Sequence, residues 1–426
     1  MNTAFVTLVK CPIFYGRRLP KAKASTVDNA LDMQSSRRGF VAGVSASTAL
    51  ILSNFAGEVR ANAIGNALLS TRKARILFNE NPLGPSSLAL AAIQASASTL
   101  GRYPLSEGPR LEMKLRKLHG LTYQETSSEL SLGPKPRLEG DSDLLLGIGS
   151  SEILRAVAWA YGSQSGNIVE AHQSYSSVGD AAVEIPGTQI QRKIIPLDNA
   201  NRLDTAAMIK AIDSDTKIVV VCNPNNPTGT TIPLSQIVAI ADAMPKDSIL
   251  LVDEAYIEFL PNADRVSAVE LAKTRKNVLV ARTFSKIFGL AGLRIGYGLG
   301  ATQMIERLRP FMLGRLSLSM AGVLAAEASM DDKQHISETM ELHQKTLELW
   351  ERGFRSAGWK MTTSEACFCW VDVGQGATEL IRFLAERDVL ISGGSRWNLP
   401  NFVRISMGTE EENDRLLAGV KAFCKA

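Results

Sequence analysis

The sequence is poor in the residues that build metal sites and disulfide frameworks. Its 426 residues include only five cysteines and four histidines. Cys367 and Cys369 would point to the same side of a strand, but no second pair of ligands follows at metal-site spacing, and the histidines are scattered. We therefore expect no metal and no disulfide framework, even in an oxidising compartment.

Most of the chain also lacks an excess of charge of one sign. The formal net charge is +4, but residues 1–63 hold eight Lys/Arg and three Asp/Glu, so the remainder is close to −1. The basic balance belongs to the N-terminal leader. We expect no nucleic-acid partner.

An apolar run suited to spanning a bilayer is missing as well. Arg37 and Arg38 precede an uncharged run at 42–52 that is short and rich in Ser, Ala and Gly, and residues 61–63 read ANA, a small-x-small cleavage site. The leader resembles a twin-arginine export signal, which implies the twin-arginine machinery as a partner and a periplasmic location. The alternatives are an organellar transit peptide or an uncleaved tail on a cytoplasmic protein, and Met33 is a possible true start.

The remaining chain has the size and pattern of an α/β protein. With 45% hydrophobic residues it can bury a large core, in two domains. Short apolar strands are expected at 144–148, 167–171, 217–222, 248–253 and 277–282. Amphipathic stretches at 151–162, 204–213 and 233–244 separate several of them. This alternation predicts a mostly parallel sheet covered by helices on both faces.

The expected domain order follows from these segments. Residues 1–63 form the leader, 64–110 an N-terminal segment that contributes to the small domain, 111–305 the large domain and 306–426 a smaller α+β domain. The small domain contains a long helix at 331–357 and a strand at 402–406. A polar stretch at 122–143 is predicted to be an inserted loop.

One lysine stands among small and apolar residues. Lys286 directly follows Ser285 and precedes Arg294 by eight positions. An apolar pocket disfavours the charged form of a lysine, so its amine becomes nucleophilic near neutral pH and can form a Schiff base. Ser285 and Arg294 could hold a phosphate beside that amine. A Schiff-base lysine next to a phosphate site indicates pyridoxal 5′-phosphate (PLP).

Three further motifs follow predicted strands, where open α/β sheets bind ligands. Residues 147–152 read GIGSSE and suit an anion at a helix N-terminus, although a plain capping turn is the commoner meaning. Residues 223–229 read NPNNPTG, whose prolines fix the direction of the Asn226 amide. Asp253 is either a helix cap or a buried acid that meets a pyridinium nitrogen. Tyr256 could donate to a phenolate oxygen on that ring.

Together these motifs resemble a known enzyme family. NPNNPTG at 223–229, DEAY at 253–256, SK at 285–286, LAGLRIG at 290–296 and RISMGT at 404–409 are similar in order and spacing to the histidinol-phosphate aminotransferase branch of fold-type I PLP enzymes. The similarity extends over about residues 78–424. It implies the α/β fold of type I PLP-dependent transferases, with a large PLP-binding domain and a smaller α+β domain.

The resemblance also implies roles around the cofactor ring. Lys286 would form the Schiff base and then act as acid and base, and Asp253 would pair with the pyridinium nitrogen. Asn226 and Tyr256 would bond the ring's 3-oxygen, and Tyr175 would stack on the ring.

The ends of the cofactor and the substrate would be held by other residues. The residues implied for the phosphate are Ser150, Ser151, Ser285 and Arg294. Tyr103 would reach the phosphate of the partner subunit, which implies a homodimer with shared active sites. Asn81 and Arg404 would bind the α-carboxylate of the substrate, Arg404 as a bidentate fork. The substrates would be an L-amino acid and a 2-oxo acid.

The sequence departs from the family at one substrate position. The family usually has an arginine that helps to bind an anionic group where this chain has Ser392, and Arg396 is a nearby candidate to replace it. Histidinol phosphate is therefore not the expected substrate. Decarboxylation, or oxidation of an amino acid by oxygen, stays open as an alternative to transamination because the same cofactor supports all three.

Overall fold

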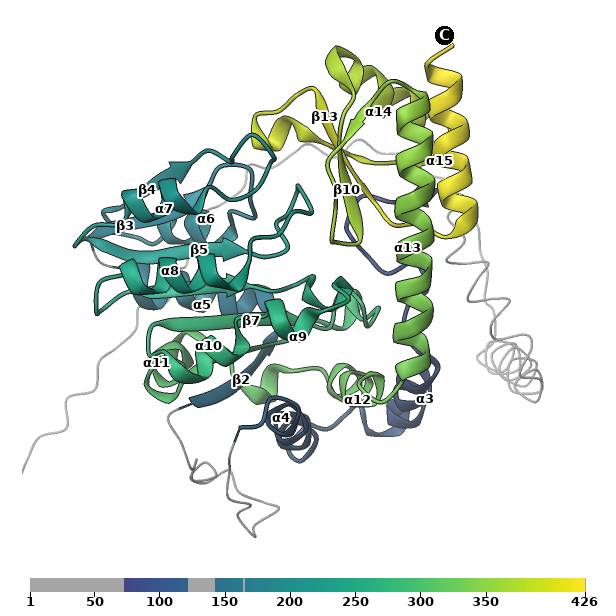
Figure 1. Cartoon of the computed structure of the whole chain (residues 1–426). Helices are drawn as coiled ribbons and strands as arrows, with labels where there is room; N and C mark the ends of the chain where they lie inside the picture. Colours follow the sequence, from purple (N-terminus) through teal and green to yellow (C-terminus); the bar gives the residue numbers. More distant parts are fainter. Residues whose placement is uncertain (1–72, 122–141, 164, 426) are drawn as a thin grey trace, which may run out of the picture. The chain divides into compact units, whose positions relative to one another are not determined.

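The computed structural model describes residues 73–121, 142–163 and 165–425 (Figure 1). The predicted export signal and most of the predicted inserted loop lie outside the described residues. Within the described part, no helix is both long and apolar enough to cross a membrane. The same part contains no group of three His, Cys, Asp or Glu side chains placed to hold a metal ion. Its cysteines are free thiols.

A seven-stranded sheet carries the larger part of the described chain. Its strands lie in the order β2-β8-β7-β6-β5-β3-β4, and all neighbours are parallel except the two pairs that β8 makes. The bounds are β2 Ser142–Ile148, β3 Gly166–Ala171, β4 Ile190–Ile195, β5 Thr216–Cys222, β6 Ile249–Asp253, β7 Val278–Thr283 and β8 Ile295–Ala301. The predicted α/β fold with a mostly parallel sheet is confirmed.

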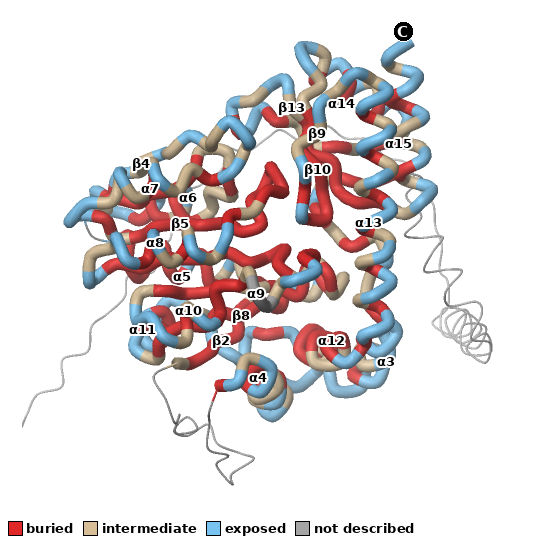
Figure 2. The backbone as a smooth tube through the Cα atoms, in the orientation of Figure 1, coloured by how far each residue is buried: buried red, intermediate tan, exposed pale blue. Residues whose placement is uncertain are grey.

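Helices cover both faces of this sheet because successive strand residues point to opposite sides and both sets are apolar. Leu144, Val219 and Leu250 belong to the core shared with one set of helices: α4 Glu107–Leu118, α7 Thr205–Ala211, α8 Leu234–Ala243, α10 Val269–Thr274 and α12 Met320–Ser329. Leu145 and Ile218 belong to the core on the other face, with α5 Ser150–Gly162, α6 Ser177–Val183 and α11 Thr302–Leu308. Figure 2 shows the central strands buried along their length.

Strands β4 and β8 lie where the sequence patterns predicted no strand. β8 reads IGYGLGA, and glycine weakens the usual strand signal. The packing requires these glycines: a Cβ on Gly296 would lie 2.3 Å from the Ser150 amide nitrogen, and one on Gly298 would lie 3.0 Å from Ile153. The glycines let the start of α5 approach the sheet closely.

A second, smaller sheet is antiparallel and has four strands in the order β12-β13-β10-β9. Its strands are β9 Lys360–Met361, β10 Phe368–Asp372, β12 Ser392–Gly393 and β13 Phe402–Ser406. It shares a core with α13 Lys333–Ser356, α14 Ala377–Ala385 and α15 Glu410–Phe423. The predicted long helix and the strand at 402–406 are confirmed.

The start of the described chain joins this smaller layer. β1 (Ala74–Arg75) pairs in parallel with β11 (Val389–Leu390). α3 (Ser87–Ser96) contacts α12, and Val323 and Ala326 of α12 belong to the core of the large sheet, although the predicted boundary at 305/306 assigns them to the small domain. The domain boundaries stay a prediction.

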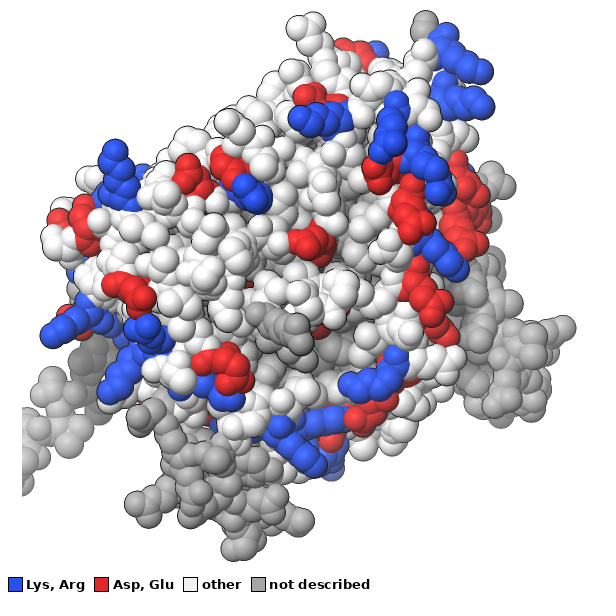
Figure 3. All heavy atoms as spheres, viewed as in Figure 1, with Lys and Arg blue, Asp and Glu red and all other residues white. Residues whose placement is uncertain are grey.

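On the face in Figure 3, basic and acidic side chains of the described residues are interspersed.

Candidate active site

The candidate site lies at the edge of the large sheet where its parallel strands end. β2, β3, β5, β6 and β7 run toward this edge, and the antiparallel β8 begins there. The segments that follow these strands carry Ser150, Tyr175, Asn226 and Lys286, and Asp253 is the last residue of β6. Sheet topology therefore brings together polar residues that are far apart in the sequence.

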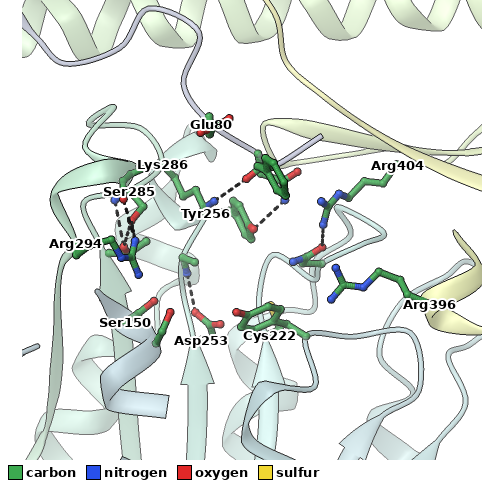
Figure 4. Close-up of a pocket in the computed structure, with 18 residues that line it drawn as sticks. Glu80, Ser150, Cys222, Asp253, Tyr256, Ser285, Lys286, Arg294, Arg396 and Arg404 are labelled. Carbon is green, nitrogen blue, oxygen red and sulfur yellow. Dashed lines mark hydrogen bonds between the residues drawn. The ribbon is translucent and has the colours of Figure 1, made fainter. Parts of the chain in front are cut away.

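These segments and the small sheet enclose a pocket of about 380 Å³ (Figure 4). Most of the residues predicted for the site line it: Ser150, Ser151, Tyr175, Asn226, Asp253, Tyr256, Ser285, Lys286, Arg294 and Arg404. Asn81 and Tyr103 do not. The pocket is also lined by residues for which no role was predicted: Phe78, Asn79, Glu80, Cys222, Ala255, Thr283 and Ala291.

Lys286 extends into the middle of the pocket. Its Nζ donates to the Phe78 carbonyl oxygen at 3.1 Å and lies 5.6 Å from the centre of the Tyr256 ring. Burial lowers the pKa of Lys286, because the ammonium form loses its hydration. The amine is thereby biased toward the neutral form that attacks a carbonyl carbon.

Asp253 lies at the floor of the pocket, below Lys286 in Figure 4. Its residue is 4% exposed, and Oδ1 accepts a hydrogen bond from the Ala255 amide at 3.2 Å. Burial raises the pKa of Asp253 to about 6. The described residues provide no ion pair for this carboxylate. Since a buried, unpaired carboxylate is costly, the position suits a ligand that brings a positive charge.

One end of the pocket, here called the anion end, is lined by Ser150, Ser151, Ser285 and Arg294. Ser150 and Ser151 stand in the first turn of α5, whose amides have no acceptor within the helix. Arg294 Nη1 donates to Ser285 Oγ at 3.2 Å. Figure 4 shows Ser150, Ser285 and Arg294 converging on the same side. Helix amides, hydroxyls and a guanidinium together form a donor set for a phosphate.

The backbone at the anion end is held by Gly149 and Arg294, which both have positive φ, 69° and 56°. The Gly149 amide donates to the Arg294 carbonyl oxygen at 3.0 Å. A Cβ on Gly149 would lie 2.4 Å from Arg294 Nη2. Glycine at this position therefore leaves the room that the guanidinium occupies.

Tyr256 is oriented by a buried hydrogen-bond chain. Asn79 Nδ2 donates to the Tyr256 hydroxyl at 2.9 Å, and Ser406 Oγ donates to Asn79 Oδ1 at 2.9 Å. The hydroxyl thus keeps its own proton for donation into the pocket. Burial raises the pKa of Tyr256 well above its usual value, so the donor stays protonated. Asn79 was not predicted as a site residue, because its partners lie far away in the chain.

The opposite end of the pocket, here called the substrate end, contains Arg404, Asn226 and Arg396. Arg404 is 5% exposed, and it donates to Asn226 Oδ1 through Nη1 and to the Leu77 carbonyl oxygen through Nη2, both at 2.6 Å. Its Nε is buried without a partner. Burial lowers the pKa of Arg404. A buried guanidinium with an unused donor is a strong site for an anion.

Asn81 and Tyr103 have other surroundings. Asn81 Nδ2 donates to the Ile287 carbonyl oxygen at 2.8 Å and to Thr339 Oγ1 at 3.1 Å, and its oxygen accepts from the Leu83 amide at 3.0 Å. Asn81 therefore anchors the loop after Lys286, whereas Asn79 lines the pocket. The predicted contact of Asn81 with the substrate stays a prediction. Tyr103 is 68% exposed, so it is open to a second subunit.

Ser392 and Arg396 differ in their relation to the pocket. Arg396, in the 3₁₀ turn Gly394–Trp397, lines the pocket, and Ser392 does not. Ser392 lies in β12 directly opposite Arg404 of β13. The Arg396 guanidinium carbon lies 4.5 Å from the ring centre of Trp397. Of the two positions, Arg396 is the one that brings a positive charge to the substrate end.

These groups fit PLP. The anion end matches its phosphate, the Lys286 amine its aldehyde and the Asp253 carboxylate its ring nitrogen. Tyr175 also lines the pocket, and the charge of Asp253 adds to burial in raising the pKa of Tyr175. The unpaired carboxylate of Asp253 is the observation that such a ligand explains best.

Comparisons with known proteins agree on one family, the aminotransferases. The model of the family "Aminotransferase class I and II" matches residues 76–420. The histidinol-phosphate aminotransferase of Brevibacillus brevis is 32% identical over 355 residues, which cover 82% of this chain and 90% of that protein. The histidinol-phosphate aminotransferase of Bacillus subtilis is 31% identical over 344 residues, which cover 81% of this chain and 89% of that protein.

Solved structures agree. The histidinol-phosphate aminotransferase of Sinorhizobium meliloti in complex with pyridoxal-5′-phosphate has a TM-score of 0.71 to this chain at 26% identity, covering 83% of this chain and 91% of that one. Aspartate aminotransferase from Thermus thermophilus with maleate, at 18% identity and a TM-score of 0.66, shares the fold.

Proposed function

The chain belongs to the class I and II aminotransferase family, and we propose that it acts on an α-amino acid as an exported homodimer. It is a PLP-dependent aminotransferase that moves an amino group from an L-amino acid to a 2-oxo acid. The observation that carries the proposed site is the position of Lys286, which lies between the anion end and Arg404 (Figure 4).

The proposed roles follow from the contacts of each residue. When bound, PLP supplies an electron sink that stabilises negative charge at the Cα of an amino acid. The lowered pKa of Lys286 lets Nζ accept a proton from that Cα and return it. Arg404 binds the α-carboxylate through its free Nε, while Asn226 and Tyr256 keep donors for the ring oxygen.

We infer that the substrate is an amino acid other than histidinol phosphate. Ser392 stands where the family resemblance predicts an anion-binding arginine, and its hydroxyl carries no charge. It also lies outside the lining of the pocket.

A half-reaction assay tests the reaction and the substrate together. Purified protein with PLP is mixed with single amino donors in the absence of a 2-oxo acid. We expect the absorption of bound PLP to be replaced by that of pyridoxamine phosphate with an α-amino acid but not with histidinol phosphate. Release of carbon dioxide or hydrogen peroxide without pyridoxamine phosphate would instead favour decarboxylation or oxidation.

The proposed homodimer is supported by exposed apolar side chains. They lie in two segments, residues 88–118 and residues 311–316, and the second segment follows α11. The two segments approach each other where Arg315 lies beside Gly108. The exposed apolar residues of these segments are Leu88, Leu90, Leu100, Tyr103, Leu105, Leu118, Phe311, Leu313 and Leu316. Leu313 is 71% exposed, and its amide bonds Glu152 in the first turn of α5, so this surface borders the anion end. A second copy of the chain would cover it and bring Tyr103 to the phosphate.

Sedimentation and PLP titration test this dimer. Leu313→Glu is expected to shift the protein toward monomers and to weaken PLP binding, because a charge would be buried in the interface. Val183→Glu, on an apolar residue that is 46% exposed on α6, is the control and should leave both unchanged. A wild-type monomer with full PLP affinity would contradict the proposal.

Export is proposed from the leader sequence alone. The twin-arginine route carries folded proteins, which would let PLP bind before transport. Changing Arg37 and Arg38 to lysine should retain the protein in the cytosolic fraction, and N-terminal sequencing of the exported wild type should begin near residue 64. Wild-type protein found only in the cytosol, with residues 37–63 intact, would count against export.

A further inference from the structure

We propose that Arg396 determines substrate specificity by binding a second, distal anionic group of the amino acid. The inference rests on the proposed function and names its substrate class: α-amino acids whose side chain ends in a carboxylate or a phosphate. The two guanidinium groups at the substrate end would then hold the two anionic groups of one molecule.

The first observation is that Arg396 presents an uncommitted charge to the pocket. It is exposed, it lines the pocket, and the described residues provide it with no carboxylate partner. Stacking on Trp397 uses the face of the guanidinium and leaves its N–H donors free. Arginine forks bind carboxylates and phosphates through two parallel hydrogen bonds.

The second observation is that the position of Arg396 is held by a rigid support. Trp397 is 5% exposed, its Nε1 donates to the Ser174 carbonyl oxygen at 3.2 Å, and its ring meets Trp370 edge to face at 5.4 Å. Arg404 lies over the same indole, with its guanidinium carbon 5.4 Å from the ring centre. The two guanidinium carbons are therefore at most about 10 Å apart, a span that the two anionic groups of one extended amino acid and their hydrogen bonds can bridge.

The third observation is the charge at this end of the pocket. Arg396 and Arg404 repel each other, and the charge of Arg396 contributes to the lowered pKa of Arg404, after burial. A ligand with one carboxylate neutralises only one of the two. Glu80, the other acid of the lining besides Asp253, bonds Arg75 at 2.9 Å and lies away from Arg396 in Figure 4. A ligand with two anionic groups therefore complements the substrate end best.

The test compares matched donors on the holoenzyme. The half-reaction is measured with glutamate against glutamine, aspartate against asparagine, and phosphoserine against serine, for the wild type and Arg396→Gln. The wild type should prefer at least one anionic donor over its neutral counterpart, and Arg396→Gln should reduce that preference, the ratio of the two kcat/KM values, about 10- to 100-fold. The pair affected distinguishes a distal carboxylate from a distal phosphate.

Binding supplies a readout that does not depend on turnover. The dissociation constants of glutarate and its monoamide glutaramate, measured by calorimetry on the holoenzyme, should differ in the wild type and converge in Arg396→Gln. Arg155→Gln is the matched control, because Arg155 also lies over a tryptophan, Trp159, at 5.8 Å, but is outside the pocket lining.

The outcomes separate the two levels of inference. If pyridoxamine phosphate forms with neutral donors as readily as with anionic ones, and Arg396→Gln leaves the ratios unchanged, the role of Arg396 is refuted and the aminotransferase stands. If no donor forms pyridoxamine phosphate, the proposed function itself fails.

Discussion

The two ends of the pocket are built in different ways. At the anion end, Ser150, Ser285 and Arg294 follow or precede strands of one sheet, the large one, and the backbone bond from Gly149 to Arg294 joins two of its loops. At the substrate end, Arg404 comes from the small sheet and bonds groups in two distant segments, Asn226 and the Leu77 carbonyl.

With the proposed roles, this difference would separate the binding of the cofactor from the selection of the substrate. The anion end depends on one sheet and its loop geometry, so its shape is set within the large sheet. The substrate end depends on how the small sheet packs against loops of the large one, so a change at Arg396 should leave the anion end undisturbed. Variants of the two ends should therefore change different binding constants, while variants between them should affect the reaction itself.

The largest effect is expected at Lys286, between the two ends. Lys286→Ala removes the amine that links to PLP and moves the proton at Cα, so turnover should fall by about 10⁴-fold or more. Borohydride reduction followed by mass spectrometry of tryptic peptides should find the cofactor on Lys286 in the wild type. Lys345→Ala, an exposed lysine on α13, is the control. A reduced adduct that persists in Lys286→Ala would overturn the assignment.

Asp253 should rank next. Asp253→Asn removes the charge that a cationic ring nitrogen needs, so turnover should fall by about 10²- to 10³-fold. Binding of the amino acid should change much less, because Asp253 lies at the floor of the pocket and not at the substrate end. The kinetic measurement that decides is kcat, and a selective rise in KM would contradict this role.

The same variant has a pH signature in the cofactor-free protein. The pKa of Asp253 is raised to about 6, above the value of about 3.9 for an unfolded chain, so the folded state binds more protons between these values. Asp253 therefore makes the free energy of unfolding fall by about 2–3 kcal/mol as pH rises from 4 through 6. Asp253→Asn should lose that slope in denaturant titrations. Glu170 and Glu258, raised to about 7, leave a residual slope in both proteins.

The sequence predicted the parts of the site that follow buried strands. Asp253, Asn226 and Lys286 each come after an apolar run, and apolar runs identify parallel strands whose carboxyl ends meet at one edge. β8 escaped prediction because its glycines, required for the approach of α5, hide the strand pattern. Asn79 escaped because its role depends on contacts with Tyr256 and Ser406, which no local pattern indicates.

At the substrate end, Arg404→Lys should weaken binding of the amino acid much more than binding of PLP. Lysine keeps the charge but loses the fork that bonds Asn226 and the Leu77 carbonyl, so kcat/KM should fall by about 10- to 100-fold. The dissociation constant of PLP should change much less, because Asn226 loses one partner while the contacts at the anion end are kept. A large loss of PLP affinity in this variant would show that the two ends are not independent.

The smallest effect is expected at the anion end, where Gly149→Ala has a close control. Gly149 and Gly187 both have positive φ, 69° and 80°, so alanine strains the backbone at either position. Only at Gly149 does the new Cβ meet another group, 2.4 Å from Arg294 Nη2, whereas nothing lies within 4 Å at Gly187.

Gly149→Ala should therefore raise the dissociation constant of PLP by about 10-fold, as expected for displacing one charged hydrogen-bond donor. Gly187→Ala should lower stability without changing PLP affinity. The KM for the amino donor, measured at saturating PLP, should be the same in both. The guanidinium that Gly149→Ala displaces belongs to the anion end, and Arg404 lies at the opposite end of the pocket.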